Sequence, residues 1–245
     1  MKSNLTLITK IALVFIAVLS LGSCRHSFNF EGVKGNGTIT TETRTITENF
    51  DKIHVNSGIR LEVTQTENRS VEVETDENIQ ALITTTVENG ILKISSNSSN
   101  NSSNGIFVRV HLPIITELKS SSGASIRNEN TLKSTSLTVD SSSGSDIDIE
   151  VEADFISMES SSGSSITTAG KALKAETASS SGSSIHAEKL LTNEIFSQAS
   201  SGSFTKVNPI LSLNAKASSG SSIRYINIPK NLDKKESSGG SISKD

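Results

Sequence analysis

The sequence predicts an all-β protein folded as a parallel β-helix, or β-solenoid, with coils of about 19–21 residues. The first supporting observation is a Ser-Ser-Gly phrase that recurs along the second half of the chain, as in SSSGASI (120–126) and SSSGSSI (160–166). A fixed period near twenty residues is typical of a stacked architecture in which each repeat contacts only its neighbours. The central glycines of the seven copies are Gly123, Gly144, Gly163, Gly182, Gly202, Gly220 and Gly239.

The second observation is that apolar residues keep fixed distances from these glycines. The positions seven and five residues before a glycine are often apolar, as in Leu137 and Val139, and small residues stand three before and one after. This period of two predicts short strands with one inward face. A flexible Ser/Gly linker is the alternative, but linkers do not hold apolar residues at fixed offsets. Three residues after the glycine, six copies carry isoleucine: Ile126, Ile147, Ile166, Ile185, Ile223 and Ile242.

The third observation is that one repeat is too small to bury its own inner face. Stacked coils pair at the ordinary interstrand spacing of about 4.8 Å, so that isoleucine lies on isoleucine inside and serine on serine at the bend. The recurrent glycine allows a tight turn there, because it lacks a Cβ. Helices do not fit, since Gly-Ser runs and β-branched residues recur throughout.

The N-terminus predicts an export signal with lipid attachment. Lys2 and Lys10 supply positive charge, and residues 11–21 form an apolar run that is too short to span a bilayer. The following Leu-Gly-Ser-Cys resembles the bacterial lipobox, in which the cysteine becomes the lipidated first residue. We therefore expect residues 1–23 to be a lipoprotein signal peptide and Cys24 the site of lipid attachment. An ordinary signal peptide with a stray cysteine is the alternative.

Removal of residues 1–23, which carry two lysines and no acid, would leave 222 residues with 21 basic and 26 acidic side chains, a net charge of −5. This balance argues against a nucleic-acid surface. We expect a tether at 24–35 and one β-solenoid domain at 36–243. That domain divides into irregular N-terminal coils (36–112) and the regular repeats (113–243).

The N-terminal half contains weaker forms of the same pattern. Gly58 fits the repeat template, because Ile53 and Val55 precede it and Leu61 follows it at the inward positions. We interpret it as the turn glycine of a divergent early coil. Asn89-Gly90 lies between two alternating segments, as in a β-hairpin.

The chain contains six segments in a specific order: FDKIHVNSGIRLEVTQ, VEVETDENI, VENGILKIS, VRVHLPIITELKSSSGASI, IRYINIPK and a closing SSGGSI. In this order they resemble the putative autotransporter adhesin "head GIN" domain family, exported proteins common among Bacteroidetes, over about residues 35–243. The triplet that names the family falls at Gly58-Ile59-Arg60, with Arg60 where asparagine is usual. The resemblance implies a right-handed β-helix and no established catalytic site.

Few residues suggest chemistry. The four histidines form no zinc signature, and no GxSxG nucleophile elbow occurs. The most suggestive set is an acidic row in which Asp146, Asp148 and Glu150, continued by two further acids, alternate with apolar residues. This row could contact calcium or another ligand. The alternative is a charged, solvated strand face that discourages edge pairing.

We therefore expect a non-enzymatic binding or structural module of the bacterial cell envelope, without cofactor or metal. It would be anchored in the outer membrane by the lipid on Cys24, face the periplasm, and bind a glycan or an envelope protein. A polysaccharide lyase or hydrolase on a β-helix is the alternative function.

Overall fold

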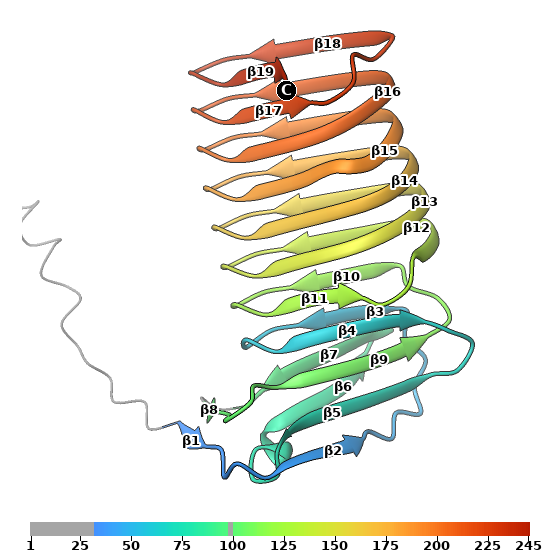
Figure 1. Cartoon of the computed structure of the whole chain (residues 1–245), viewed down its shortest axis with the longest axis vertical. Coiled ribbons are helices and arrows are strands. Elements are labelled where there is room, and N and C mark those ends of the chain that lie inside the picture. The colour runs from blue at the N-terminus through green and yellow to red at the C-terminus, as the bar shows by residue number, and fades with distance from the viewer. Residues whose placement is uncertain (1–31, 98–99) are drawn as a thin grey trace, which may run out of the picture. The chain divides into compact units, whose positions relative to one another are not determined.

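The computed structural model describes residues 32–97 and 100–245, of which Val33–Asp245 form one compact unit. The predicted signal peptide and Cys24 lie outside these residues. Seventeen strands form one hydrogen-bonded sheet that folds over on itself, so the stack has two flat sides. This all-β solenoid has about seven turns and coils of about 19 residues, as predicted (Figure 1).

The two sides run the length of the stack. Side A consists of the strands that follow the tight Ser-Gly turns and side B of those that precede them, each extended by N-terminal strands that pair beside them. Side A contains β2 (Ile39–Thr43), β5 (Ser70–Asp76), β9 (Phe107–Leu112), β4 (Arg60–Gln65), β11 (Ser125–Asn128), β17 (Ser222–Tyr225) and β19 (Ser241–Lys244). Side B contains β6 (Ile83–Glu88), β7 (Ile91–Ser96), β3 (Lys52–Val55), β10 (Glu117–Ser120), β12 (Leu132–Ser141) and β18 (Asn231–Glu236).

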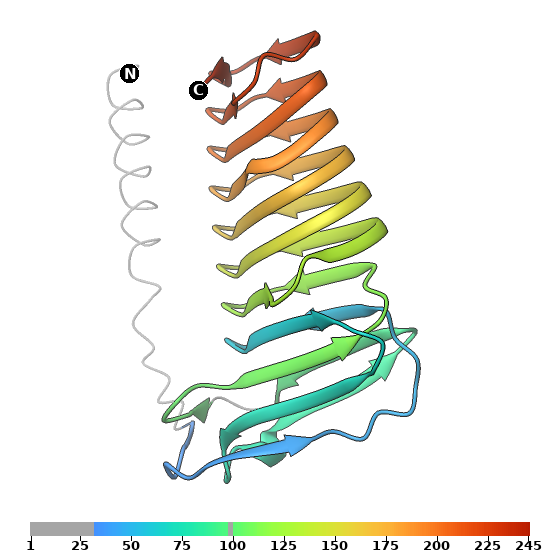
Figure 2. The same ribbon diagram turned by 45° about the vertical axis from the view of Figure 1, so that its right-hand side comes forward.

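Four long strands belong to both sides, because each bends midway and continues on side B. They are β13 (Asp146–Ser160), β14 (Ser165–Ser179), β15 (Ser184–Ala199) and β16 (Phe204–Ala217). Figures 1 and 2 show the bends along one edge of the stack and the tight turns along the other. Gly170 lies in the bend of β14 with φ 110°, where a Cβ would stand 2.1 Å from the Val151 carbonyl oxygen.

The inward columns are those that the repeat predicts. Neighbouring coils pair in parallel register, with Ile126 beside Ile147, Ile147 beside Ile166, and Ile166 beside Ile185. All four side chains are fully buried. In the one copy without isoleucine, Thr205 occupies this column and bonds to the Ser179 hydroxyl at 2.8 Å. The core is therefore a set of like-on-like columns between the two sides.

The tight turns share one backbone geometry. In each, the serine before the glycine also has positive φ, as in Ser162 (54°) and Gly163 (70°), and the residue after it donates its N–H back across the turn, as Ser164 does to the Ser161 carbonyl at 3.3 Å. Two consecutive positive φ angles define a type I′ turn. The turns also bond to one another, since Gly163 N–H donates to the Ser181 carbonyl of the next coil at 3.1 Å.

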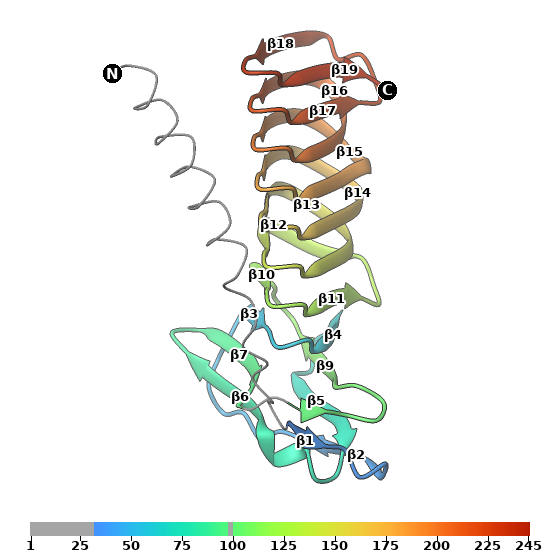
Figure 3. The ribbon, with the colours of Figure 1, turned by 90° about the vertical axis from the view of Figure 1, so that its left-hand side faces the viewer.

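The N-terminal end departs from the regular stack. β3 and β4, on either side of Gly58, pair in parallel with β10 and β11, which confirms the early coil. Beyond it the pairing is antiparallel: β5 with β9 and β2 on side A, and β6 with β7 on side B (Figure 3). A single 3₁₀ turn, η1 (Gln80–Leu82), joins β5 to β6, while β1 (Val33–Lys34) pairs with β8 (Asn100–Asn101). No helix within the described part of the chain combines the length and apolarity of a membrane span.

Candidate functional site: a groove across side B

The predicted acidic row lies on the outer surface of side A. Asp146, Asp148 and Glu150 alternate along β13 with the buried Ile147 and Ile149. Successive carboxylates on one strand face stand roughly 6–7 Å apart. Over residues 32–97 and 100–245, no three His, Cys, Asp or Glu side chains come together as a metal site would require.

The neighbouring coils bring basic groups beside this row that the sequence did not reveal. Arg127 of β11 lies directly opposite Asp148, and it also lies opposite Glu62 of β4 on its other side. The pKa of Asp146 is raised, chiefly by burial and then by the charge of Asp148, while Arg127 and His186 oppose the shift. From Arg109 through Glu62 and Arg127 to Asp148, charges therefore alternate in sign across neighbouring strands of side A.

The predicted turn glycines all lie along the edge where the tight turns stack. Gly58, Gly123, Gly144, Gly163, Gly182, Gly202 and Gly220 have φ between 69° and 72°. A Cβ built on any of them would meet no atom within 4 Å. Glycine is therefore required for the backbone conformation and not for space, which makes this edge structural.

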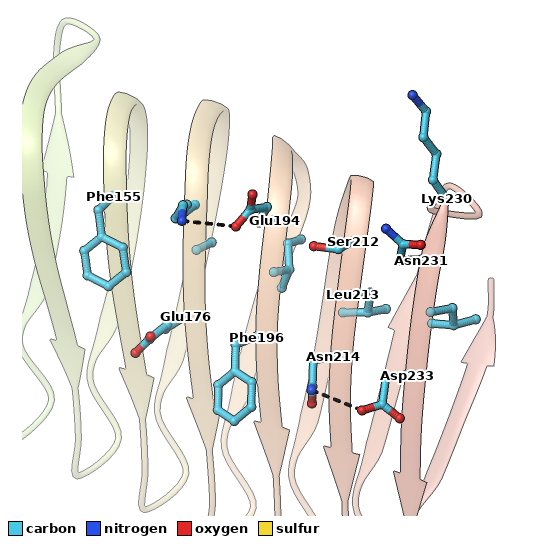
Figure 4. A pocket seen from close by; sticks show the side chains of 14 residues that line it. Phe155, Glu176, Glu194, Phe196, Ser212, Leu213, Asn214, Lys230, Asn231 and Asp233 are labelled. Atoms are coloured by element: carbon cyan, nitrogen blue, oxygen red, sulfur yellow. Dashed lines mark hydrogen bonds and ion pairs between the residues drawn. The ribbon is translucent and has the colours of Figure 1, made fainter.

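Side B carries a surface groove of about 690 Å³ that crosses β13, β14, β15, β16 and β18. Figure 4 shows its lining side chains in strand order. Phe155 and Phe196 alternate with buried inward residues, so their rings lie on the outer surface, where both are half-buried. In the figure both rings turn their faces to the viewer.

Polar groups surround the two rings. An ion pair joins Lys174 Nζ to Glu194 Oε2 at 3.2 Å, and Asn214 Nδ2 donates to Asp233 Oδ2 at 3.2 Å. Glu176 is also exposed, and its carboxylate makes no ion pair or hydrogen bond among the described residues. The groove thus combines flat apolar surface with hydrogen-bonding groups on a rigid sheet.

Sequence reasoning did not identify this groove. Aromatic residues are only 4% of the chain, so stacking surfaces appeared scarce. A signal was present, however: Phe155 and Phe196 stand eight and six residues before their turn glycines, at outward positions that are charged or polar in the other coils from β12 onwards. An outward aromatic residue, at a repeat position that is polar in most other copies, indicates a functional surface.

Solved structures with the same fold include proteins from Bacteroides fragilis and two Parabacteroides species. A putative adhesin from Bacteroides fragilis matches with TM-score 0.82 and 19% identity, covering 87% of this chain and 100% of its own. A putative lipid binding protein from Parabacteroides distasonis matches with TM-score 0.74, 19% identity and coverage of 88% and 100%. A putative adhesin from Parabacteroides merdae gives TM-score 0.71, 19% identity and coverage of 87% and 99%. At such identity these likenesses show the fold alone.

No curated protein matches the chain. A family model does, that of the putative auto-transporter adhesin head GIN domain, over residues 49–229. This span includes the Gly58 turn, in whose triplet Arg60 stands 4.2 Å above the Phe107 ring, and every strand of the side B groove except β18. Because the model covers well over half of the sequence, the chain belongs to the head GIN domain family.

Proposed function

We propose that this protein is a lipid-anchored component of the bacterial cell envelope that acts by binding an extended partner and not by catalysis. The observation that carries the proposal is the side B groove, which crosses five strands and therefore spans roughly 19 Å along the stack. Its lining is built on paired strands, so its groups hold fixed positions relative to one another. Such a surface suits a partner that is itself long and regular.

The state of the groove's charged groups favours binding over catalysis. Glu194 is engaged by Lys174 and Asp233 by Asn214, while Glu176 has no base beside it among the described contacts. A lyase or hydrolase requires an acid and a base placed on the same reacting bond. The lyase or hydrolase remains the second candidate function, since β-helix sides can hold polysaccharides.

The proposed anchor is the lipid on Cys24, and its support is the lipobox-like context of the only cysteine in the chain. Two or more acyl chains anchor a protein stably, whereas a single chain gives marginal binding. Cys24→Ala should release the protein from the membrane fraction and remove the mass of the lipid. A variant that stays membrane-bound at unchanged mass would exclude this anchor. We place the protein on the outer membrane, facing the periplasm.

The binding function is tested with detergent-solubilised, full-length protein immobilised on beads and incubated with solubilised envelope fractions of the producing bacterium. We expect specific retention of an envelope component and no release of reducing or unsaturated sugar ends. If nothing is retained, the binding function is wrong. Release of such sugar ends from envelope polysaccharide would establish the enzymatic candidate instead.

A further inference from the structure

We propose that the ligand of the side B groove is a linear glycan of neutral or N-acetylated amino sugars that crosses the strands on a diagonal, with sugar rings on Phe155 and Phe196. This inference rests on the proposed binding function and names its ligand class.

The state of the two rings is the first argument. Burying an aromatic ring stabilises a protein, yet these two rings lie outside the core on a water-exposed surface. Among the described residues, no other ring and no cation packs against Phe155, and Phe196 meets only Lys216, whose Nζ lies 4.9 Å from the ring centroid. Lys216 is exposed, and its flexible stem can move aside. The exposed part of each ring is therefore available to a ligand.

The chemistry of these faces fits a sugar. The face of an aromatic ring carries partial negative charge, which attracts the polarised C–H groups of an apolar surface. One side of a pyranose ring presents such C–H groups, while its hydroxyls point outward around the rim. A sugar can therefore stack on a ring and still bond to polar side chains beside it.

The relative positions of the rings set the direction of the ligand. Phe155 pairs in register with Lys174, and Lys174 with Glu194, so Phe196 is two strands and two residues away from Phe155. This offset places the rings roughly 12 Å apart on a diagonal across the strands. A short run of linked sugars can bridge that distance. A single sugar cannot touch both rings.

The polar groups provide the remaining contacts. Glu176, Asn214 and Asp233 carry planar carboxylate and amide groups, which can hydrogen-bond to adjacent sugar hydroxyls. The groove is lined by two lysines and three acids, so its charges nearly balance. Such balance does not favour a strongly anionic polymer, whose binding would need a basic surface.

A protein partner fits a different place better. Protein interfaces have a contiguous apolar centre, whereas an ion pair lies between the two rings here. The large exposed aliphatic side chains of the later coils instead include Leu173, Leu191 and Ile210, which line a separate hollow at the bend edge. Those residues serve as the comparison site for a protein ligand.

The test uses full-length protein in detergent on an array of immobilised linear oligosaccharides, made of β-linked neutral hexoses or N-acetylhexosamines. We expect binding to at least one series, increasing with chain length up to several sugars. The double variant Phe155→Leu/Phe196→Leu keeps apolar bulk but removes both aromatic faces, and it should lose at least tenfold in affinity. The matched control is Phe107→Leu/Phe204→Leu, which changes two outward rings of side A and should bind as the parent does.

A second arm separates the inference from the function on which it rests. Envelope fractions are treated with protease or with periodate, which cleaves vicinal diols, before incubation with the immobilised protein. Retention that survives protease and disappears after periodate supports the glycan. Retention that is lost to protease, or to Leu173→Ser/Leu191→Ser but not to the groove variant, overturns the glycan and leaves a binding function. Absence of any retention overturns both.

Discussion

The Ser164 hydroxyl donates a hydrogen bond of 2.6 Å to the main-chain carbonyl of Ser141, one coil earlier. The same bond recurs at the turns of Gly144 to Gly220, from Ser145 to Ser120 at 2.8 Å and from Ser183 to Ser160 at 2.6 Å, and likewise from Ser203 and Ser221. All five hydroxyls are buried. The serine-rich phrase is therefore a ladder of bonds between coils as well as a turn.

This ladder predicts different costs for two serines of one turn. Ser164→Ala should lower the free energy of unfolding by about 1–2 kcal/mol, because it removes a buried hydroxyl with several partners. Ser162→Ala, at the exposed turn tip, should cost under about 1 kcal/mol, because that hydroxyl makes no bond among the described contacts. Ala124 already occupies the Ser164 position in the first regular coil, so the change is sterically accommodated. Denaturant unfolding of both variants checks the order of the two costs, and the reverse order would contradict the ladder.

The isoleucine column predicts a much larger effect. Ile166 is fully buried between Ile147 and Ile185. Ile166→Asp would place an unpaired carboxylate in the core, which should cost more than about 4 kcal/mol or prevent folding. Far-ultraviolet circular dichroism and urea unfolding measure this loss, with Ile166→Val as the control that keeps the column apolar. If the aspartate variant unfolds at the same urea concentration as Ser162→Ala, the register is wrong.

What the sequence could predict follows from repetition. The inward columns, the turns and the Gly58 coil each repeat a local pattern, so the offsets from one glycine define them. The Asn89-Gly90 turn could also be predicted locally, because these two residue types readily adopt positive φ, here 54° and 77°. Local periodicity was sufficient to predict the structure wherever consecutive repeats in the sequence stack as neighbouring coils in the fold.

The rest depends on which distant residues become neighbours. Arg127 lies opposite both Asp148 and Glu62, and that position follows from stacking β11 between β4 and β13. The groove needed the register of five strands to bring Phe155 and Phe196 onto one surface. Antiparallel pairing of β5 with β9 could not be read from alternation alone, because alternation is the same in both directions.

A buried carboxylate at the N-terminal end predicts acid sensitivity. Hydrogen bonds from the Ser102 and Ser103 side chains, followed by those from the Gly37 and Ser103 main chain, hold the pKa of Asp76 far below its ordinary value. Because the pKa is depressed in the folded state, the stabilisation is complete above the unfolded pKa of about 3.9 and is lost as pH falls below it. The free energy of unfolding should therefore decrease below about pH 4. Asp76→Asn should be less stable at pH 7 and should show a shallower pH dependence. An equally steep acid dependence in that variant would assign the effect to other carboxylates.

The acidic row of side A predicts a mild phenotype. The raised pKa of Asp146 means that its ionised form is disfavoured in the folded protein, so neutralising it relieves repulsion from Asp148. Neutralising Asp148 has the opposite effect, because it removes the attraction between its carboxylate and Arg127 on the neighbouring strand. The triple variant Asp146→Asn/Asp148→Asn/Glu150→Gln should therefore remain folded and change calcium or partner binding only modestly. Thermal unfolding and calcium titration measure the two effects, and unfolding of the variant would show that the row is structural.

The last coil carries charged residues that should prevent further strands from adding to the stack. In register with β16 and β17, Lys234 follows Ala215, Glu236 follows Ala217 and Lys244 follows Tyr225, so charged residues take over three inward columns at once. Lys234 Nζ donates to the Ile242 carbonyl at 3.2 Å, and Glu236 Oε1 accepts from the Ile242 N–H at 2.5 Å. Charges at inward positions block the pairing of a further strand layer, because they would be buried without partners.

Replacing these charged residues with the apolar types of the preceding coils should therefore allow further strands to pair with this end of the stack. Lys234→Ala/Glu236→Ala/Lys244→Val gives β18 and β19 the inward pattern of the preceding coils, and should produce concentration-dependent association in size-exclusion chromatography with light scattering. The control Asp233→Ala/Lys235→Ala removes two charges from the outward face of the same strand and should elute as the parent protein does. Because both variants make β18 less charged, association of the first alone isolates the inward positions. Association of both, or of neither, would mean that the inward charges are not what limits stacking at this end.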